Sequence, residues 1–145
     1  MNKFMKEAID EAYIGITNQH GGPFRCVIVK NGRIVGSDHN EVIKNQDCTC
    51  HGEIMAIRDA CKNLESFDLS GCDLYTTSAP CPMCQGAIQW ANIDKVFVGC
   101  NIADAEDIGF RDKVFYKAAP KMIEVDRESC LELFATYKSL PKIKY

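Results

Sequence analysis

The spacing of apolar residues changes along the chain, and each change marks an expected helix or strand. Residues 1–18 carry apolar side chains at a roughly helical spacing among charged ones, which predicts a helix: Phe4, Ala8, Ala12, Ile14 and Ile16. Residues 24–29 form a short apolar, β-branched run and predict a buried strand. Asn31-Gly32 is a strong hairpin-turn signal, so residues 33–37 are expected to return antiparallel.

A second helix is expected to start at about His51, where apolar residues recur on one helical face: Ile54, Ile57, Cys61 and Leu64. Residues 72–77 predict a strand. Pro82 suits the first turn of a further helix, which is expected to continue to Ala91. The apolar run at residues 95–99 predicts another strand.

The last part of the chain is expected to hold two more helices and one more strand. We predict a short helix at residues 103–108, ended by Gly109, and a longer helix at residues 128–137. Residues 121–125 predict the last strand. Residues 39–50 are polar and irregular, so we expect a loop there.

This order of elements favours an α/β fold, a three-layer α-β-α sandwich with a mixed sheet of about five strands. The chain has 145 residues, which is long enough for a full hydrophobic core. It shows no internal repeat and no linker-like segment. We therefore expect residues 1–145 to form a single domain.

Composition narrows the classes of partner. The chain is 46% hydrophobic and 26% charged, with a formal net charge of −3. Proteins that hold a long nucleic acid usually present a basic surface, so no nucleic acid partner is expected. No stretch approaches the roughly 20 apolar residues of a membrane span, so no membrane partner is expected either.

The cysteines favour a reducing compartment. There are nine of them, an odd number at irregular spacing, which is not typical of a secreted disulfide framework. The N-terminus has no apolar run of signal-peptide length. We expect a cytoplasmic location.

Two short motifs carry the candidate chemistry. His51-Gly52-Glu53 is followed by Pro80-Cys81-Pro82-Met83-Cys84. One imidazole and two thiolates occupy three corners of a tetrahedral zinc site and leave the fourth for water. Zinc lowers the pKa of a bound water from 15.7 to about 7, which makes a nucleophile available at neutral pH. Glu53 is not needed as a ligand, so we predict that it moves protons.

Other interpretations of the cysteines stay open at this point. Cys50, His51, Cys81 and Cys84 could close a structural zinc site without catalysis. Cys81 and Cys84 could form a thioredoxin-like redox pair, which would leave His51 and Glu53 unexplained. His20 and His39 lack metal-ligand spacing to the motif, and we expect them on the surface or in loops.

The sequence resembles the cytidine and nucleobase deaminase superfamily, whose signature is His-x-Glu followed by Pro-Cys-x-x-Cys. Within it, the chain is most similar to bacterial guanine deaminases, over nearly its whole length. That similarity is carried by residues 21–24, 39–42, 80–91, 104–112 and 144–145. Gly52 stands where those enzymes usually have alanine, and in this the motif is similar to microbial cytosine deaminases.

The resemblance implies an activity and a set of site residues. One zinc ion per chain would be held by His51, Cys81 and Cys84, with Glu53 as the catalytic proton shuttle. The implied substrate-binding residues are Phe24 against the ring, Asn40 at the ring edge, and Asp112 and Tyr145 near the amine. The resemblance also implies a homodimer, in some relatives with an exchanged C-terminal segment.

We therefore expect a zinc-dependent hydrolytic deaminase that converts guanine to xanthine and ammonia. Deamination of cytosine to uracil is the first alternative, and deamination of adenosine in transfer RNA is the second. A zinc-binding module without catalysis is the alternative from another class of protein.

Overall fold

The computed structural model, which describes residues 1–141 and 143–145, places strand β1 (Arg25–Lys30) inside a four-stranded sheet. Side chains alternate along β1, so Cys26 and Ile28 point to one face of the sheet whereas Val27 and Val29 point to the other. All four are buried. Burial on both faces requires a layer of structure on each side of the sheet.

The sheet is mixed, and its strand order is β2-β1-β3-β4. β1 and β2 (Arg33–His39) form the predicted antiparallel hairpin. Asn31 and Gly32 both take a positive φ, which is what a tight two-residue hairpin turn requires. β3 (Cys72–Ser78) pairs antiparallel with β1, and β4 (Lys95–Cys100) runs parallel to β3.

The prediction of a fifth strand at residues 121–125 is wrong. This segment is exposed and pairs with no strand in the part of the chain that the structure describes. Outside a sheet, a single strand leaves its backbone N–H and C=O groups without ladder partners. An apolar, β-branched pattern is therefore not enough to make this segment a strand.

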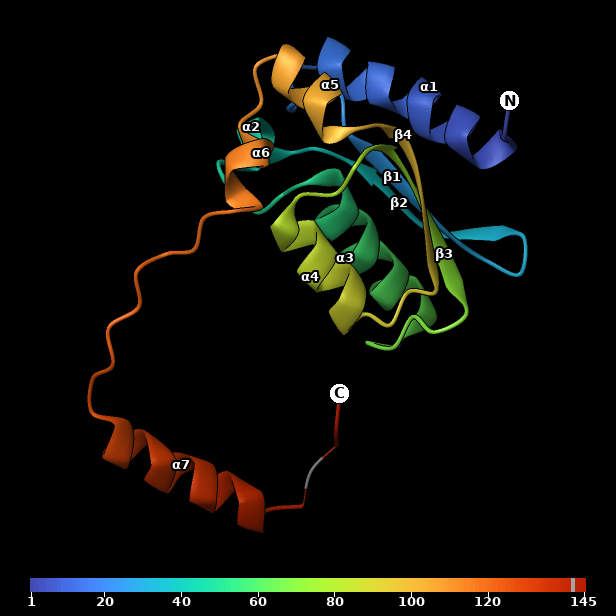
Figure 1. Cartoon of the computed structure of the whole chain (residues 1–145). Helices are drawn as coiled ribbons and strands as arrows, with labels where there is room; N and C mark the ends of the chain where they lie inside the picture. Colours follow the sequence, from blue (N-terminus) through green and yellow to red (C-terminus); the bar gives the residue numbers. More distant parts are fainter. Residues whose placement is uncertain (142) are drawn as a thin grey trace.

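Helix α1 (Lys3–Thr17) covers one face of the sheet, and α3 (Gly52–Leu64) and α4 (Pro82–Trp90) cover the other (Figure 1). On the α1 side, Phe4 packs against Val27, Val29 and Tyr75. The opposite side holds the main core, formed by Cys26, Ile28, Ala56, Ala60, Leu69, Cys72, Leu74, Ile88 and Ala91. The expected helical layers on both faces are present.

Two helices of one turn were not predicted. α2 (Val42–Asn45) lies inside the segment that we expected to be a loop, and α6 (Asp112–Phe115) follows α5 (Ile102–Asp107). A helix this short is about one turn long, so no repeating apolar spacing can reveal it.

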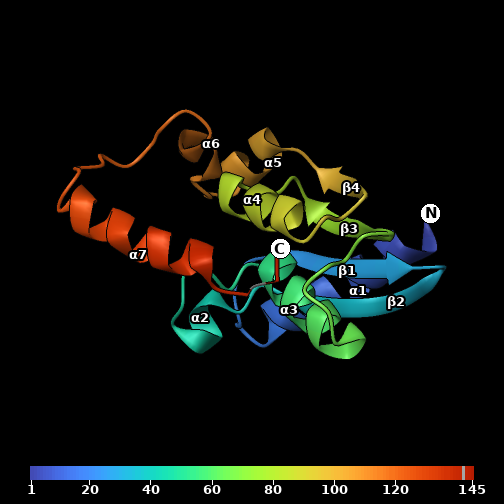
Figure 2. The ribbon, with the colours of Figure 1, turned by 90° about the horizontal axis from the view of Figure 1, so that it is seen from below.

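After α6 the chain leaves this body, and its last residue, Tyr145, lies against it again beside Trp90 and Phe67. We call residues 117–141 and 143–145 the C-terminal arm; it contains helix α7 (Arg127–Ser139). In Figures 1 and 2 the chain runs away from α6 before α7 begins, and α7 has no buried residue. None of the described helices is both long enough and apolar enough to span a bilayer.

Candidate active site

The three predicted metal ligands lie at the starts of two neighbouring helices. His51 immediately precedes α3 and Cys81 immediately precedes α4, both with extended backbone conformations. Neither side chain caps its own helix, so both can point across the space between the helices. Cys84 lies one turn after Cys81, and its sulfur therefore reaches the same point.

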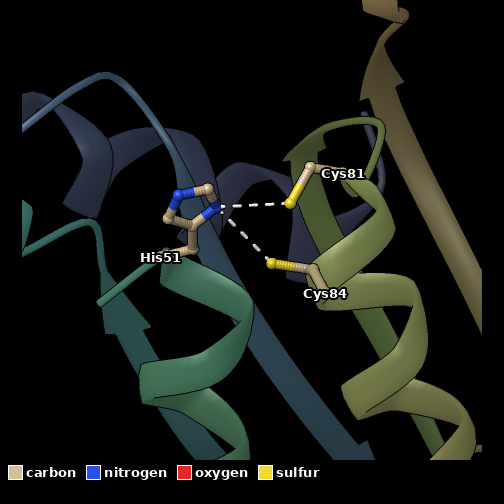
Figure 3. A group of neighbouring side chains, drawn as sticks. All are labelled: His51, Cys81 and Cys84. Carbon is tan, nitrogen blue, oxygen red and sulfur yellow. Dashed lines mark hydrogen bonds between the residues drawn. The ribbon is translucent and has the colours of Figure 1, made fainter. Parts of the chain in front are cut away.

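Figure 3 shows the imidazole of His51 facing both sulfurs, with Nδ1 3.6 Å from the Sγ of Cys81 and 3.6 Å from the Sγ of Cys84. Zinc–ligand distances of about 2.0–2.1 Å to nitrogen and 2.3 Å to sulfur, at a tetrahedral angle, give a nitrogen–sulfur separation of about 3.6 Å. The observed spacing therefore fits a zinc ion. His51, Cys81 and Cys84 form the zinc-binding site, with three protein ligands.

The protonation states of His51, Cys81 and Cys84 are also compatible with binding of a divalent cation. Hydrogen bonding with Cys84 and His51 lowers the pKa of the Cys81 thiol to about 4, so this sulfur is a thiolate at neutral pH. Hydrogen bonding with Cys81, together with burial, raises the pKa of Cys84. Hydrogen bonding with Cys81 also raises the pKa of His51. In the metal-free chain one thiolate attracts protons from both neighbours, and a divalent cation would displace those protons.

Cys50 does not join this group. Its sulfur accepts a hydrogen bond from Asn45 Nδ2 at 3.6 Å. Among the described residues, the metal group around His51 contains only Cys81 and Cys84 besides His51 itself. The structure therefore gives no support to a structural zinc site closed by Cys50.

Glu53 lies in the first turn of α3, beside the metal group but not as a member of it. Its Oε2 accepts a hydrogen bond from the Sγ of Cys84 at 3.5 Å, and its Oε1 accepts one from Thr76 at 3.3 Å. The residue is only 5% exposed, and burial raises the pKa of its carboxyl group. A carboxyl group with a raised pKa is suited to accept and return a proton near neutral pH.

A cavity of about 460 Å³ adjoins the metal group, and Phe24, Asn40 and Asp112 line it together with Glu53. The ring of Phe24 lies against the edge of Phe110, with ring centroids 4.6 Å apart. Burial raises the pKa of Asp112. Three of the four predicted substrate-binding residues therefore meet at one cavity.

Tyr145, the fourth, is not among the residues that line the cavity. It is 81% exposed, and its ring lies 5.9 Å from that of Trp90 and 6.2 Å from that of Phe67, measured between centroids. Its contact with substrate therefore stays a prediction.

Sequence reasoning missed the contacts that join α6 to the loop before α4. The hydroxyl of Tyr116 donates a hydrogen bond to the carbonyl of Pro80, and Gln85 Nε2 donates to the same carbonyl at 3.1 Å. Pro80 precedes Cys81, and Tyr116 follows the helix that begins with Asp112. Tyr116 and Pro80 are 36 positions apart, so no local pattern in the sequence could have indicated the contact.

His20 and His39, expected to be unrelated surface or loop residues, meet in the structure. His20 Nδ1 lies 2.7 Å from His39 Nε2, and the two rings are nearly parallel. Together with Glu41 they form a second group of clustered ligand atoms.

Comparison with known proteins agrees with the expected resemblance. Residues 1–100 match the family described as the cytidine and deoxycytidylate deaminase zinc-binding region. The chain is 45% identical over 121 residues to a guanine deaminase of Bacillus subtilis, a match that covers 83% of this chain and 78% of that protein. The X-ray structure of guanine deaminase from Bacillus subtilis superposes with a TM-score of 0.92 at 37% identity, covering 100% of this chain and 99% of that one. A tRNA-specific adenosine deaminase of Buchnera aphidicola is 30% identical over 138 residues, covering 92% of this chain and 91% of that protein.

Proposed function

Because the chain belongs to the cytidine and deoxycytidylate deaminase family, we propose that it is a zinc-dependent guanine deaminase. The reaction takes guanine and water to xanthine and ammonia. The observation that carries this proposal is the full-length superposition on a guanine deaminase, in a chain where His51, Cys81 and Glu53 line one cavity.

Zinc bound by His51, Cys81 and Cys84 supplies a Lewis acid that lets a water molecule act as the nucleophile near neutral pH. Glu53 then performs the proton transfers. It takes a proton from the attacking water and passes it to the ring nitrogen beside the attacked carbon. It then takes the remaining proton of that water, from the hydroxyl group now on the attacked carbon, and passes it to the amine, so that the C=O bond forms as the C–N bond breaks and ammonia leaves. Its burial supports this role, because a raised pKa lets the carboxyl group hold the proton between the two transfers.

The cavity walls supply the proposed recognition of the base. The side-chain amide of Asn40 can both donate to and accept from the ring edge, and the carboxylate of Asp112 can accept from the N–H groups of guanine. Phe24 offers an aromatic surface to the ring. A base without the matching groups would leave these buried polar atoms unpaired, which is how such a site rejects related bases.

The similarity to tRNA-specific adenosine deaminases supports a second candidate, deamination of adenosine in transfer RNA. The net charge of −3 disfavours it, because tight binding of a nucleic acid depends on neutralising its phosphates with basic side chains.

Ammonia release from the zinc-loaded enzyme tests the proposal. The panel holds guanine, cytosine, adenine, their nucleosides and a transfer RNA, and Glu53→Gln serves as the inactive control. We expect release from guanine above all others. Faster release from cytosine or from transfer RNA would replace guanine as the substrate, and no release from any of them would favour a zinc-binding module without catalysis.

We further propose that residues 1–145 form one domain that works as a homodimer with an exchanged C-terminal arm. Apolar side chains are exposed on β4 and α7: Val96, Phe97, Val98, Leu131, Leu133 and Phe134. Single chains rarely expose so much apolar surface, and a second copy that receives the arm would cover it. A cytoplasmic location fits this proposal for the enzyme, because Cys81 and Cys84 must stay reduced to bind zinc.

Sedimentation velocity tests the dimer. We expect the wild-type protein to sediment as a dimer and Phe134→Asp to sediment as a monomer, because the charge makes burial of α7 unfavourable. A wild-type protein that stays monomeric at micromolar concentration would contradict the exchange.

A further inference from the structure

We propose that His20, His39 and Glu41 form a second metal site, for a divalent transition metal of the zinc class. The ligand atoms of the three residues all lie within 4.8 Å of one another. His20 Nδ1 is 2.7 Å from His39 Nε2, which is 3.7 Å from the Oε1 of Glu41. Two imidazoles and a carboxylate are a donor set that zinc and its neighbours in the periodic table bind well.

The imidazole of His39 is already oriented for such a site. Its Nδ1 is buried and makes no hydrogen bond to any residue that the structure describes, but it lies 3.5 Å from the Oδ1 of Asp38. A carboxylate at this nitrogen favours the tautomer with the proton on Nδ1, which leaves the lone pair of Nε2 directed at His20 and Glu41. Gly15 of α1 makes room for the ring, because a Cβ there would lie 2.9 Å from Cδ2 of His39.

The carboxylate of Glu41 is held at the site from its other side. Glu41 is 8% exposed, and its Oε2 accepts a hydrogen bond from Asn45 at 2.9 Å. Its Oε1 forms an ion pair with Lys44 at 2.8 Å. Lys44 is therefore a competing cation, since its ammonium occupies the oxygen that faces His39. Its side chain is 49% exposed and can turn into solvent when a metal binds.

A simple hydrogen bond between two neutral imidazoles is the competing explanation of the 2.7 Å distance. Binding of one zinc ion by both nitrogens would separate them to about 3.3 Å. The hydrogen bond uses only the two rings, whereas the metal site also requires the carboxylate of Glu41. The two explanations therefore differ in what they predict for Lys44 and Glu41.

A metal bound at this second site would link two segments of the chain that line the cavity. His20 directly precedes Gly21 and Gly22, and Asn40 lies between His39 and Glu41. The carbonyl of His20 also accepts hydrogen bonds from the backbone N–H groups of Ile43 and Lys44, each at 3.1 Å. A metal at this point would therefore stabilise the wall that carries Asn40, without contacting the substrate.

Metal counting on the full-length protein tests the site. The protein is equilibrated with excess zinc, passed through a desalting column and analysed by mass spectrometry for zinc per chain. We expect two zinc ions in the wild type, one in His20→Asn and one in Glu41→Gln. Cys81→Ser/Cys84→Ser is the matched control, because it removes the first site and should keep one zinc ion.

Cobalt gives a second readout that does not depend on activity. Cobalt in the site of Cys81 and Cys84 produces thiolate charge-transfer absorption, whereas cobalt at His20, His39 and Glu41 does not. A second equivalent of cobalt should therefore bind without further charge-transfer absorption, and its affinity should rise about tenfold in Lys44→Met. One metal per chain in the wild type, or a second metal that persists in His20→Asn and Glu41→Gln, would overturn the proposal.

Discussion

Glu53 shows that the needs of catalysis and of stability conflict at a single residue. Its side chain is buried beside Cys84 and Thr76, where a negative charge is solvated far less than in bulk water. Burial consequently raises the pKa of the carboxyl group above its ordinary value. The same feature that makes the group a useful proton carrier therefore destabilises the folded protein when the group is ionised.

The direction of this pKa shift predicts how the stability of Glu53→Gln depends on pH. Because the folded pKa lies above the unfolded one, the stabilising contribution of Glu53 is present at low pH and is lost as pH rises through the folded pKa. In zinc-free protein, Glu53→Gln should be more stable than the wild type at pH 8, by a margin that shrinks at pH 5. Urea denaturation at both pH values measures this, and equal stability at pH 8 would contradict it.

The same substitution should slow turnover strongly while the metal stays bound. Proton transfer by a positioned side chain contributes about 10²-fold to 10⁴-fold to a rate, so kcat for guanine should fall by that factor in Glu53→Gln. Metal analysis should still find zinc at His51, Cys81 and Cys84. A variant with a near-native rate would remove Glu53 from the mechanism.

Asn40 is the residue at which recognition of the base can be tested. Asn40→Ala removes an amide from the cavity wall and leaves the facing polar atoms of the base unpaired, which should lower kcat/KM for guanine about 10-fold to 100-fold. Asn63→Ala is the control, because Asn63 lies outside the cavity lining at the end of α3. Equal kinetics in the two variants would mean that Asn40 only shapes the loop.

At the scale of elements, the site depends on how α6 is attached to the loop before α4. Tyr116 and Gln85 share the carbonyl of Pro80, next to Cys81. Because Asp112 begins α6, this attachment also sets where its carboxylate lies relative to the zinc ligands.

Tyr116→Phe tests that attachment. The lost hydrogen bond is worth about 1 kcal/mol, and without it the carboxylate of Asp112 should be held less firmly beside the zinc ligands. We therefore expect kcat/KM to fall severalfold and the zinc content to stay unchanged. Tyr13→Phe, at a side chain that is 64% exposed on α1, is the control. A loss of zinc in Tyr116→Phe would instead indicate that the contact holds Cys81 itself.

Elements with a long or distinctive pattern could be predicted from the sequence. The helix α3, the hairpin turn at Asn31-Gly32 and the start of α4 at Pro82 all lie where the pattern placed them. The strand expected at residues 121–125 fails because pairing depends on a neighbouring strand and not on the segment itself.

The residues of the site also separate into those that a sequence motif predicts and those that come together only through the fold. His51, Glu53, Cys81 and Cys84 belong to motifs with fixed spacing, and they come together as expected. The meeting of His20 with His39 could not be predicted, because it follows from the packing of β2 against the segment after α1. Tyr145 lies outside the cavity of its own chain, and its role depends on where the C-terminal arm goes.

For the whole molecule, zinc joins two helices that share one face of the sheet. His51 begins α3 and the two cysteines begin α4, so a bound ion links the two helices at their N-terminal ends. Binding to the folded state alone stabilises it by about 4 kcal/mol when free zinc exceeds its Kd about 1,000-fold.

Removal of zinc should therefore affect stability as well as activity. A strong chelator should abolish guanine turnover and lower the melting temperature, and added zinc should restore both. Calorimetry with and without chelator measures the shift, with Cys81→Ser/Cys84→Ser as the control; its response to chelator should be smaller than that of the wild type, because only the second proposed site can still lose a metal. An unchanged melting temperature after complete loss of zinc would show that α3 and α4 do not depend on the ion.

Strand β4 has a consequence for the handling of this protein. Its outer edge is the last in the sheet order, and Val96, Phe97 and Val98 are each at least 39% exposed there. Unpaired edges with apolar side chains are where chains stack into fibrils. In the proposed dimer a second copy covers these side chains when the arms are exchanged. If a protease clips the segment before α7, this cover is lost, and the remaining body should form β-rich precipitates on storage, whose growth thioflavin fluorescence would follow.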